Sequence, residues 1–176
     1  MLSILQLIID AVATIIGGAL LLRFWMQAVR VRPPASVAQF TFTVSDWLVK
    51  PLRRLIPGVG GYDWASLIGA LLIIMLATCI TLLWGADVGG TLRWGMYRFF
   101  SWILYGFMAL LIVEAVFSWI NPQAPLAPFV RALNDPLLRP LRRVVPLLGG
   151  LDLSMLVALI LLQIAQVLLK MVFGYS

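Results

Sequence analysis

Residues 46–63 read DWLVKPLRRLIPGVGGYD, and residues 135–152 read DPLLRPLRRVVPLLGGLD. Aligned at an offset of 89, the two stretches are identical at ten of eighteen positions. The alignment continues back without a gap to Pro33 over Pro122 and Phe40 over Phe129. Coincidence is a poor explanation for a match of this length, so the sequence predicts an internal repeat of two copies.

Long apolar segments flank each copy of this stretch. A transmembrane helix needs about 20 apolar residues to cross the hydrocarbon, and four segments qualify, namely Ile4–Val29, 67–84, 99–120 and 153–173. Because each copy contributes two spans, both copies enter the membrane in the same direction. The sequence predicts an all-α membrane protein with four transmembrane helices, built from parallel repeats over residues 1–90 and 91–176 that share one membrane domain.

The composition narrows the classes of function. Of the 176 residues, 62% are hydrophobic and 11% are charged, against roughly 45–50% apolar residues in a soluble domain. The net charge of +6 comes from basic residues beside apolar spans rather than from a folded basic face, so we expect no nucleic-acid partner. Because the chain has no histidine and only one cysteine, Cys79, we expect no metal, no cofactor and no intramolecular disulfide.

The basic residues predict the orientation in the membrane. The two long loops between paired spans carry nine of them: Arg30, Arg32, Lys50, Arg53, Arg54, Arg131, Arg139, Arg142 and Arg143. The opposite side carries three, Arg93, Arg98 and Lys170. By the positive-inside rule, we expect both long loops to be cytoplasmic and both termini to lie outside.

Within each long loop, apolar residues recur at helical spacing and the charges fall on the other face. We expect amphipathic helices over residues 37–56 and 126–145, lying in the headgroup plane between the two spans of each repeat. Pro51 and Pro140 lack an amide N–H and should kink or break these helices. Pro57 and Pro146 should end them.

A sharp turn should follow each loop helix, because glycine adopts backbone angles that other residues avoid. The glycines are Gly60 and Gly61 in the first copy, and Gly149 and Gly150 in the second. Asp63 and Asp152 stand directly before the next apolar run, where a carboxylate can cap the helix, with ion binding as the alternative.

The paired arginines of the motif leave two interpretations open. They are Arg53 with Arg54, and Arg142 with Arg143. One interpretation is recognition of anionic lipid or of an acidic partner. The other is an ordinary cluster of stop-transfer charges at the cytoplasmic boundary of the membrane.

At this motif the chain resembles the YggT family of small bacterial and plastid membrane proteins, whose repeats carry conserved Pro, Arg-Arg, Gly-Gly and Asp positions between two spans. Both copies match the second half of the family pattern, through Pro51, Arg53, Arg54, Pro57, Gly60, Gly61 and Asp63, and through Pro140, Arg142, Arg143, Pro146, Gly149, Gly150 and Asp152. The Asn-Pro that often opens the loop is present at Asn121 and Pro122 but is Arg32 and Pro33 in the first copy.

The resemblance covers nearly the whole chain. It implies the four-span fold and residence in the bacterial plasma (inner) membrane. Members of the family are associated with osmotic tolerance, with cell-envelope or division processes, and with the biogenesis of membrane complexes in plastids. The family has no agreed molecular activity and no established catalytic residues, so none is carried over to this chain.

Charged groups at bilayer depth are costly, which makes Arg23 and Glu114 functional candidates. They lie at similar depths on spans that run in the same direction, so we expect the first and third helices to be neighbours joined by an ion pair between these side chains. The alternative is that Arg23 extends to the headgroups while Glu114 is protonated or faces a polar cavity. Gln163, Gln166 and Lys170 share one face of the last span, where we expect interhelical hydrogen bonds or a polar cavity.

Two functions from different classes fit these features. The first is a non-enzymatic membrane scaffold of the cell envelope, whose cytoplasmic-side Pro/Arg-Arg motifs contact anionic lipid or a membrane or cytoplasmic partner protein. The alternative is a channel or small transporter in osmotic or ion homeostasis, acting as a homo-oligomer because four short spans enclose little space. We expect no enzyme, since intramembrane catalysis needs paired carboxylates, a Ser/His dyad or metal ligands.

Overall fold

The computed structural model describes residues 2–56, 58–145 and 153–175. Within these ranges all of the regular elements are helices. The expectations for five motif residues lie outside the described residues and are not addressed further: Pro57, Pro146, Gly149, Gly150 and Asp152.

Among the described residues, four helices are long and apolar enough to cross a membrane. They are α1 (Leu2–Val29), α3 (Trp64–Cys79) with the short 3-10 helix η1 (Ile80–Trp84) that continues it, α4 (Val88–Ile120) and α6 (Ser154–Phe173). For the described residues, the expectation of an all-helical fold with four helices long and apolar enough to span a membrane is therefore confirmed.

Helix α4 begins eleven residues before the expected start at residue 99, because 99 − 88 = 11. Arg93 and Arg98 interrupt the apolar pattern, yet the helix starts at Val88, where the Asp87 carboxylate accepts a hydrogen bond of 2.5 Å from the Gly90 amide. A helix of 33 residues is about 50 Å long, against about 30 Å of hydrocarbon. It must therefore extend beyond the hydrocarbon or tilt within it.

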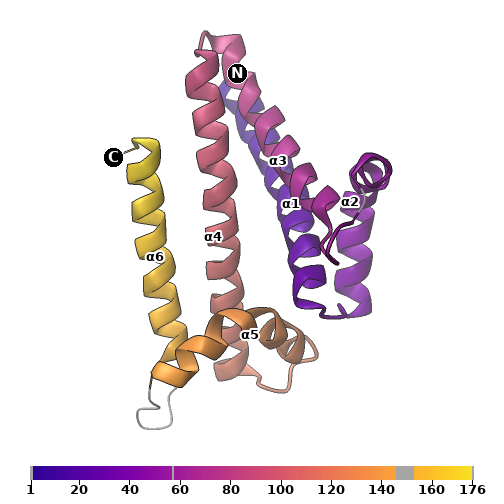
Figure 1. Cartoon of the computed structure of the whole chain (residues 1–176), viewed down its shortest axis with the longest axis vertical. Helices are drawn as coiled ribbons and strands as arrows, with labels where there is room; N and C mark the ends of the chain where they lie inside the picture. The colour runs from indigo at the N-terminus through magenta and orange to yellow at the C-terminus, as the bar shows by residue number, and fades with distance from the viewer. Residues whose placement is uncertain (1, 57, 146–152, 176) are drawn as a thin grey trace.

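The two loop segments are helical, as expected. Helix α2 spans Ala35–Leu55 and helix α5 spans Ala127–Val144. Pro51 and Pro140 were expected to kink or break these helices, and the break is wrong, because each helix continues through its prolines: Pro51 in α2, and Pro136 and Pro140 in α5. All three rings lie on the exposed side, where a carbonyl that loses its N–H partner can find another donor. Helix α2 changes direction in its last turns, which Figure 1 shows nearly end-on.

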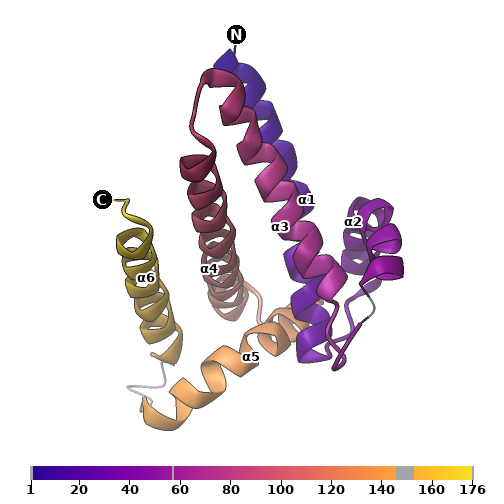
Figure 2. The same ribbon diagram turned by 45° about the horizontal axis from the view of Figure 1, so that its top comes forward.

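The two halves of the chain have the same order of elements, a span, a loop helix and a second span. Helix α1 packs on α2 and α3, and α4 packs on α5 and α6. The halves meet chiefly where α3 contacts α4, with further contacts from α1 to α4 and α5. In Figures 1 and 2 helix α5 lies at the bottom of the molecule and α2 lies beside α1 and α3, while the N-terminus is at the top and the C-terminus is at the upper end of α6.

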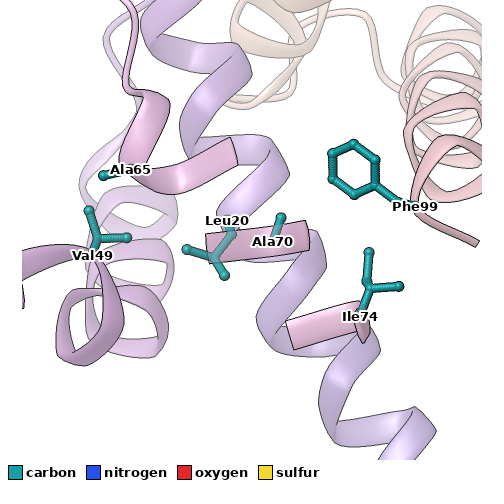
Figure 3. Close-up of a cluster of buried hydrophobic side chains, with 6 residues drawn as sticks. All are labelled: Leu20, Val49, Ala65, Ala70, Ile74 and Phe99. Atoms are coloured by element: carbon teal, nitrogen blue, oxygen red, sulfur yellow. The ribbon is translucent and has the colours of Figure 1, made fainter. Parts of the chain in front are cut away.

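Each half has its own buried apolar cluster. In the first half Leu20, Val49, Ala65, Ala70 and Ile74 pack together, and Phe99 reaches them from α4 (Figure 3). In the second half the buried cluster is smaller and consists of Leu111, Leu138, Ala158 and Leu162. Val49 and Leu138 come from the loop helices, so each loop helix is packed against its own pair of spans.

Candidate functional site

The first charge cluster lies where α1, α2 and the start of α3 meet. It consists of Arg23, Ser45, Asp46, Arg53, Asp63 and Ser66. Arg23 is only 7% exposed although it belongs to a membrane span. Its Nη1 donates to Asp46 Oδ1 at 2.6 Å and to Ser45 Oγ at 2.8 Å. Its Nε lies 3.4 Å from Asp63 Oδ2. The loop helix thus supplies the groups that compensate a charge buried in the first span.

Asp63 is the most buried acid of this cluster, at 2% exposure. Arg53 binds it through two bonds, with Nε donating to Oδ1 at 3.2 Å and Nη2 to Oδ2 at 2.5 Å. Ser66 Oγ also donates to Oδ2, at 2.7 Å. Burial acts to raise the pKa of Asp63, but the bonds from Arg53 and Ser66 outweigh it and the pKa is lowered. The same pairing raises the pKa of Arg53.

The expected helix cap at Asp63 is wrong. The residue does occupy the position before α3, but its side chain makes no capping hydrogen bond to the backbone. Arginine side chains take the carboxylate instead, because a guanidinium offers two donors in a planar fork that matches both oxygens. Gly60 and Gly61 have φ angles of +69° and +81°, which confirms that this turn uses backbone angles favoured by glycine.

The second charge cluster consists of Glu114, Arg131, Asn134 and Arg142. Glu114 lies in α4 and is 3% exposed. Asn134 Nδ2 donates to Glu114 Oε2 at 2.8 Å and also to the Leu110 carbonyl at 2.9 Å. Arg142 Nη2 and Arg131 Nε lie 3.5 Å and 3.9 Å from Glu114 Oε1. Here helix α5 compensates the charge buried in a span, as α2 does in the first cluster, but the buried charge is negative and the compensating side chains are basic.

The expected ion pair between Arg23 and Glu114 is wrong. Within the described ranges each is paired inside its own half, Arg23 with two aspartates and Glu114 with Asn134 and two arginines. Equal depth along two helices does not place two side chains on facing sides, and these two face their own loop helices. The first and third spans nevertheless touch, and the ion pair that joins them is Asp10 with Arg98, at 2.7 Å.

This ion pair belongs to a far-end cluster on the opposite side of the spans from α2 and α5. Arg98 Nη2 donates to Asp10, its Nη1 donates to Thr78 Oγ1 at 3.4 Å, and its guanidinium lies 5.6 Å from the centre of the Trp102 ring. The cluster therefore ties α1, α3 and α4 together. Sequence reasoning missed it because Arg98 was counted only among the basic residues on the side opposite the long loops. The sequence did contain a signal for this pair, because Asp10 in the first span and Arg98 in the third lie toward the same side of the membrane.

The polar residues on one face of the last span have different surroundings, since Gln166 is buried whereas Gln163 and Lys170 are exposed. Gln166 is 6% exposed and bonds Ser101 of α4 twice: its Nε2 donates to the Ser101 carbonyl at 3.1 Å, and its Oε1 accepts from Ser101 Oγ at 3.0 Å. Interhelical hydrogen bonding is thus confirmed for Gln166. Gln163 and Lys170 lie on the exposed surface.

The two arginines of each pair have different surroundings. Arg53 and Arg142 contact the buried carboxylates of their clusters. Arg54 and Arg143 are exposed, and in the part of the chain that the structure describes neither takes part in an ion pair. The first arginine therefore fixes the loop helix to the spans, and the second points outward.

Other basic side chains of α2 and α5 are also exposed. Lys50 lies 3.0 Å from Asp46, and Arg139 lies 2.5 Å from Asp135, each one helical turn away. Such exposed pairs contribute little to stability. We call the exposed residues Lys50, Arg54, Arg131, Arg139 and Arg143 the basic surface of α2 and α5.

Comparison with known proteins gives one family and several relatives. The CCB3/YggT family model matches residues 2–84 and 94–173. The chain is 40% identical over 155 residues to an uncharacterised protein of Pseudomonas aeruginosa, covering 84% of this chain and 79% of that protein. It is 32% identical over 170 residues to the uncharacterised protein YggT of Escherichia coli K12, covering 91% and 86% of the two chains. No solved structure matches it.

Proposed function

Because the chain belongs to the CCB3/YggT family and has four helices able to span a membrane, we propose that it is a non-enzymatic membrane scaffold that binds anionic lipid headgroups. The basic surface of α2 and α5 makes the contact. In this proposal the protein resides in the bacterial inner membrane, with the loop helices on the cytoplasmic side and both termini outside. An acidic partner protein is the alternative ligand of the same surface.

The observation that carries the proposal is that the two arginines of each pair make different contacts. All four arginines are exposed, but Arg53 and Arg142 engage buried carboxylates, whereas Arg54 and Arg143 make no ion pair with a described residue. A guanidinium stays charged at every physiological pH, and its planar donors match the oxygens of a phosphate. A stop-transfer cluster needs only charge, so the outward position of one arginine in each pair supports headgroup binding.

The outer face of α2 adds support. Phe40 and Trp47 are 56% and 59% exposed on the same helix that carries Lys50 and Arg54. The indole N–H of Trp47 donates to the Val44 carbonyl at 2.8 Å, so this ring can enter an apolar layer without an unsatisfied donor. Exposed aromatic and basic side chains together are typical of a helix in the headgroup region.

The element order supports two lipid-binding helices on one membrane face. Each half has a loop helix between two spans, and the sequence copies share the Arg-Arg motif at the same offset. In Figures 1 and 2 α5 lies at the bottom of the molecule and α2 lies beside α1 and α3. A parallel repeat therefore doubles the basic surface instead of presenting one copy on each side.

The channel alternative has weaker support. The buried charged side chains and Gln166 of the described residues fall into separate clusters, in which they pair with neighbouring side chains at the two ends of the spans and between α4 and α6. A groove of about 610 Å³ between α1 and α4 is lined mainly by apolar side chains such as Leu21, Phe107 and Leu110. Such a lining suits lipid rather than ions or water.

The test replaces Arg54 and Arg143 by glutamine together. The protein is purified with its lipids and the enrichment of phosphatidylglycerol over phosphatidylethanolamine is measured by mass spectrometry. Each basic residue near an anionic surface contributes about 1 kcal/mol, so the enrichment should fall about fivefold per residue removed. The matched control, Arg93→Gln with Lys170→Gln, removes two charges at the other end of the spans and should leave the enrichment unchanged.

Three results would decide against the proposal. An unchanged enrichment in the Arg54/Arg143 variant removes lipid binding. Loss of a co-purifying acidic protein in that variant, with lipid unchanged, assigns the basic surface to a protein partner. Ion flux through liposomes that contain the purified protein, above that of empty liposomes, favours the channel.

A further inference from the structure

Gln163 is a polar residue at the middle of a membrane span. It lies nine residues after Ser154 and ten before Phe173, the two ends of α6. At 1.5 Å per residue it is about 14–15 Å from either end, which is the midplane of a hydrocarbon layer about 30 Å thick. A glutamine side chain is too short to reach the headgroups from that depth.

The Gln163 amide has no hydrogen-bond partner among the described residues. The residue is exposed on the outer side of α6. In the described part of the chain its side chain makes no hydrogen bond. Hydrocarbon offers neither donor nor acceptor, so an amide left in lipid is costly.

Gln166, three residues further along the same helix, is a glutamine that faces inward and can be compared with Gln163. Gln166 is buried and exchanges two hydrogen bonds with Ser101. Gln163 carries the same group on a side of α6 that the other described helices leave exposed. The contrast indicates that its partner comes from outside the chain.

Helix α6 is at the edge of the molecule, where a second chain can reach it. Its helix–helix packing is with α4 and α5 alone among the described elements, and Figure 1 shows it outermost in its half. Leu156, Ile160 and Val167 share the outer side with Gln163 and are 55%, 46% and 50% exposed.

These four residues follow a heptad seam. The intervals 156–160, 160–163 and 163–167 are four, three and four residues, which is the spacing of the contact positions in a left-handed helix pair. A single polar residue within such a seam fixes register and the number of strands. Lys170 stands at the next seam position, in the last turn of α6, where its long side chain can extend to the headgroups.

We propose that α6 is the dimer contact of this protein, with Gln163 bonded to Gln163 of a second copy. All copies cross the membrane in the same direction, so a two-fold axis along the membrane normal brings the two residues to equal depth. The amide is both donor and acceptor, and is therefore complementary to itself across such an axis. Hydrogen bonds of this kind join helices in membranes, where small or polar residues hold interfaces together.

The test is disulfide cross-linking in native membranes, in a Cys79→Ala background. Ile160→Cys and Val167→Cys should give a covalent dimer of this chain. Ile164→Cys should give little, because Ile164 is equally exposed, at 49%, but lies off the seam. Adding Gln163→Leu should lower cross-linking at 160 and 167 about threefold for each amide bond lost, and Gln163→Asn should restore part of it.

The fold itself provides the control. Gln163→Leu should leave the melting temperature in detergent unchanged, whereas Gln166→Leu should lower it, because only Gln166 has bonds within the chain. Equal cross-linking at 160 and 164, cross-linking unaffected by Gln163→Leu, or adducts to a different protein would each overturn the dimer. None of these results depends on whether the basic surface binds lipid.

Discussion

Arg53 and Asp63 form a two-bond ion pair that ties the end of α2 to the start of α3. Asp63 also lies 3.4 Å from Arg23 of α1, so one carboxylate connects the first span, the loop helix and the second span. The ion pair therefore holds the end of α2 against the start of α3.

Replacing Asp63 by asparagine should strongly destabilise the protein. The carboxylate is 2% exposed and accepts from Arg53 and Ser66, and its loss leaves Arg53 and Arg23 without their shared partner. Removing one member of a buried pair typically costs about 3–5 kcal/mol. Thermal unfolding in detergent measures the loss. Asp135→Asn, which removes the acid of an exposed pair, should cost about 0–1 kcal/mol, and equal losses would contradict the assignment.

The first charge cluster should also make stability depend on pH at the acidic end. A hydrogen bond from Arg23, then one from Lys50, lower the pKa of Asp46 below the usual 3.8. The unfolded chain therefore binds this proton more tightly than the folded one. The stability that the pair contributes is complete above about pH 4 and is lost as pH falls through the lowered value.

This dependence can be isolated by comparing the parent with Asp46→Asn. The melting temperature of the parent in detergent should fall more steeply below about pH 4 than that of the variant, which lacks the titrating group. Above that pH the difference between the two proteins should be constant. Parallel curves over the whole range would show that Asp46 does not contribute.

Sequence reasoning located the helices well and the charged contacts poorly. Apolar runs and helical spacing are properties of single segments, and they identified the four spans and both loop helices within a few residues, except for the start of α4. Contacts depend on which side of a helix faces which neighbour. Arg23 and Glu114 were matched by depth alone, whereas Asp46 and Asn134, their main partners, belong to the loop helices.

The repeat could have revealed these partners. Asn134 occupies the position of Ser45 in the first copy, because 134 − 89 = 45, and Ser45 accepts from Arg23. The two copies thus use the same loop-helix position to contact a buried charge in the preceding span. The charged residues themselves did not point to this equivalence. Arg23 and Glu114 have opposite charges and do not occupy equivalent positions of the repeat.

Charge changes at Arg23 and Glu114 should act independently. We expect Arg23→Gln and Glu114→Gln each to destabilise the protein, and the double variant to lose the sum within about 0.5 kcal/mol. Arg23→Gln combined with Asp46→Asn should instead lose less than the sum, because their side chains are 2.6 Å apart. Strong coupling between Arg23 and Glu114 in unfolding experiments would restore the direct pair.

Two adjacent glycines of α1 should respond differently to alanine. A Cβ at Gly17 would lie 2.6 Å from the Trp102 ring of α4, whereas a Cβ at Gly18 would have no neighbour within 4 Å. Gly17→Ala should therefore push α4 away and cost about 1–3 kcal/mol. Gly18→Ala should be neutral, or stabilising by up to about 1 kcal/mol through helix propensity. Similar melting temperatures for the two variants would contradict the close contact between α1 and α4.

The orientation in the membrane can be tested with two single cysteines in the Cys79→Ala background. Val88 begins α4 and Val59 lies between α2 and α3, at opposite ends of the spans, and they are 63% and 65% exposed. Neither position is therefore shielded by the fold. Nine basic residues on the loop side against three on the other side predict that the loop side is cytoplasmic. In intact spheroplasts an impermeant maleimide should label Val88→Cys quickly and Val59→Cys only after lysis. Labelling of Val59→Cys with protection of Val88→Cys would invert the topology and place the basic surface away from the cytoplasm.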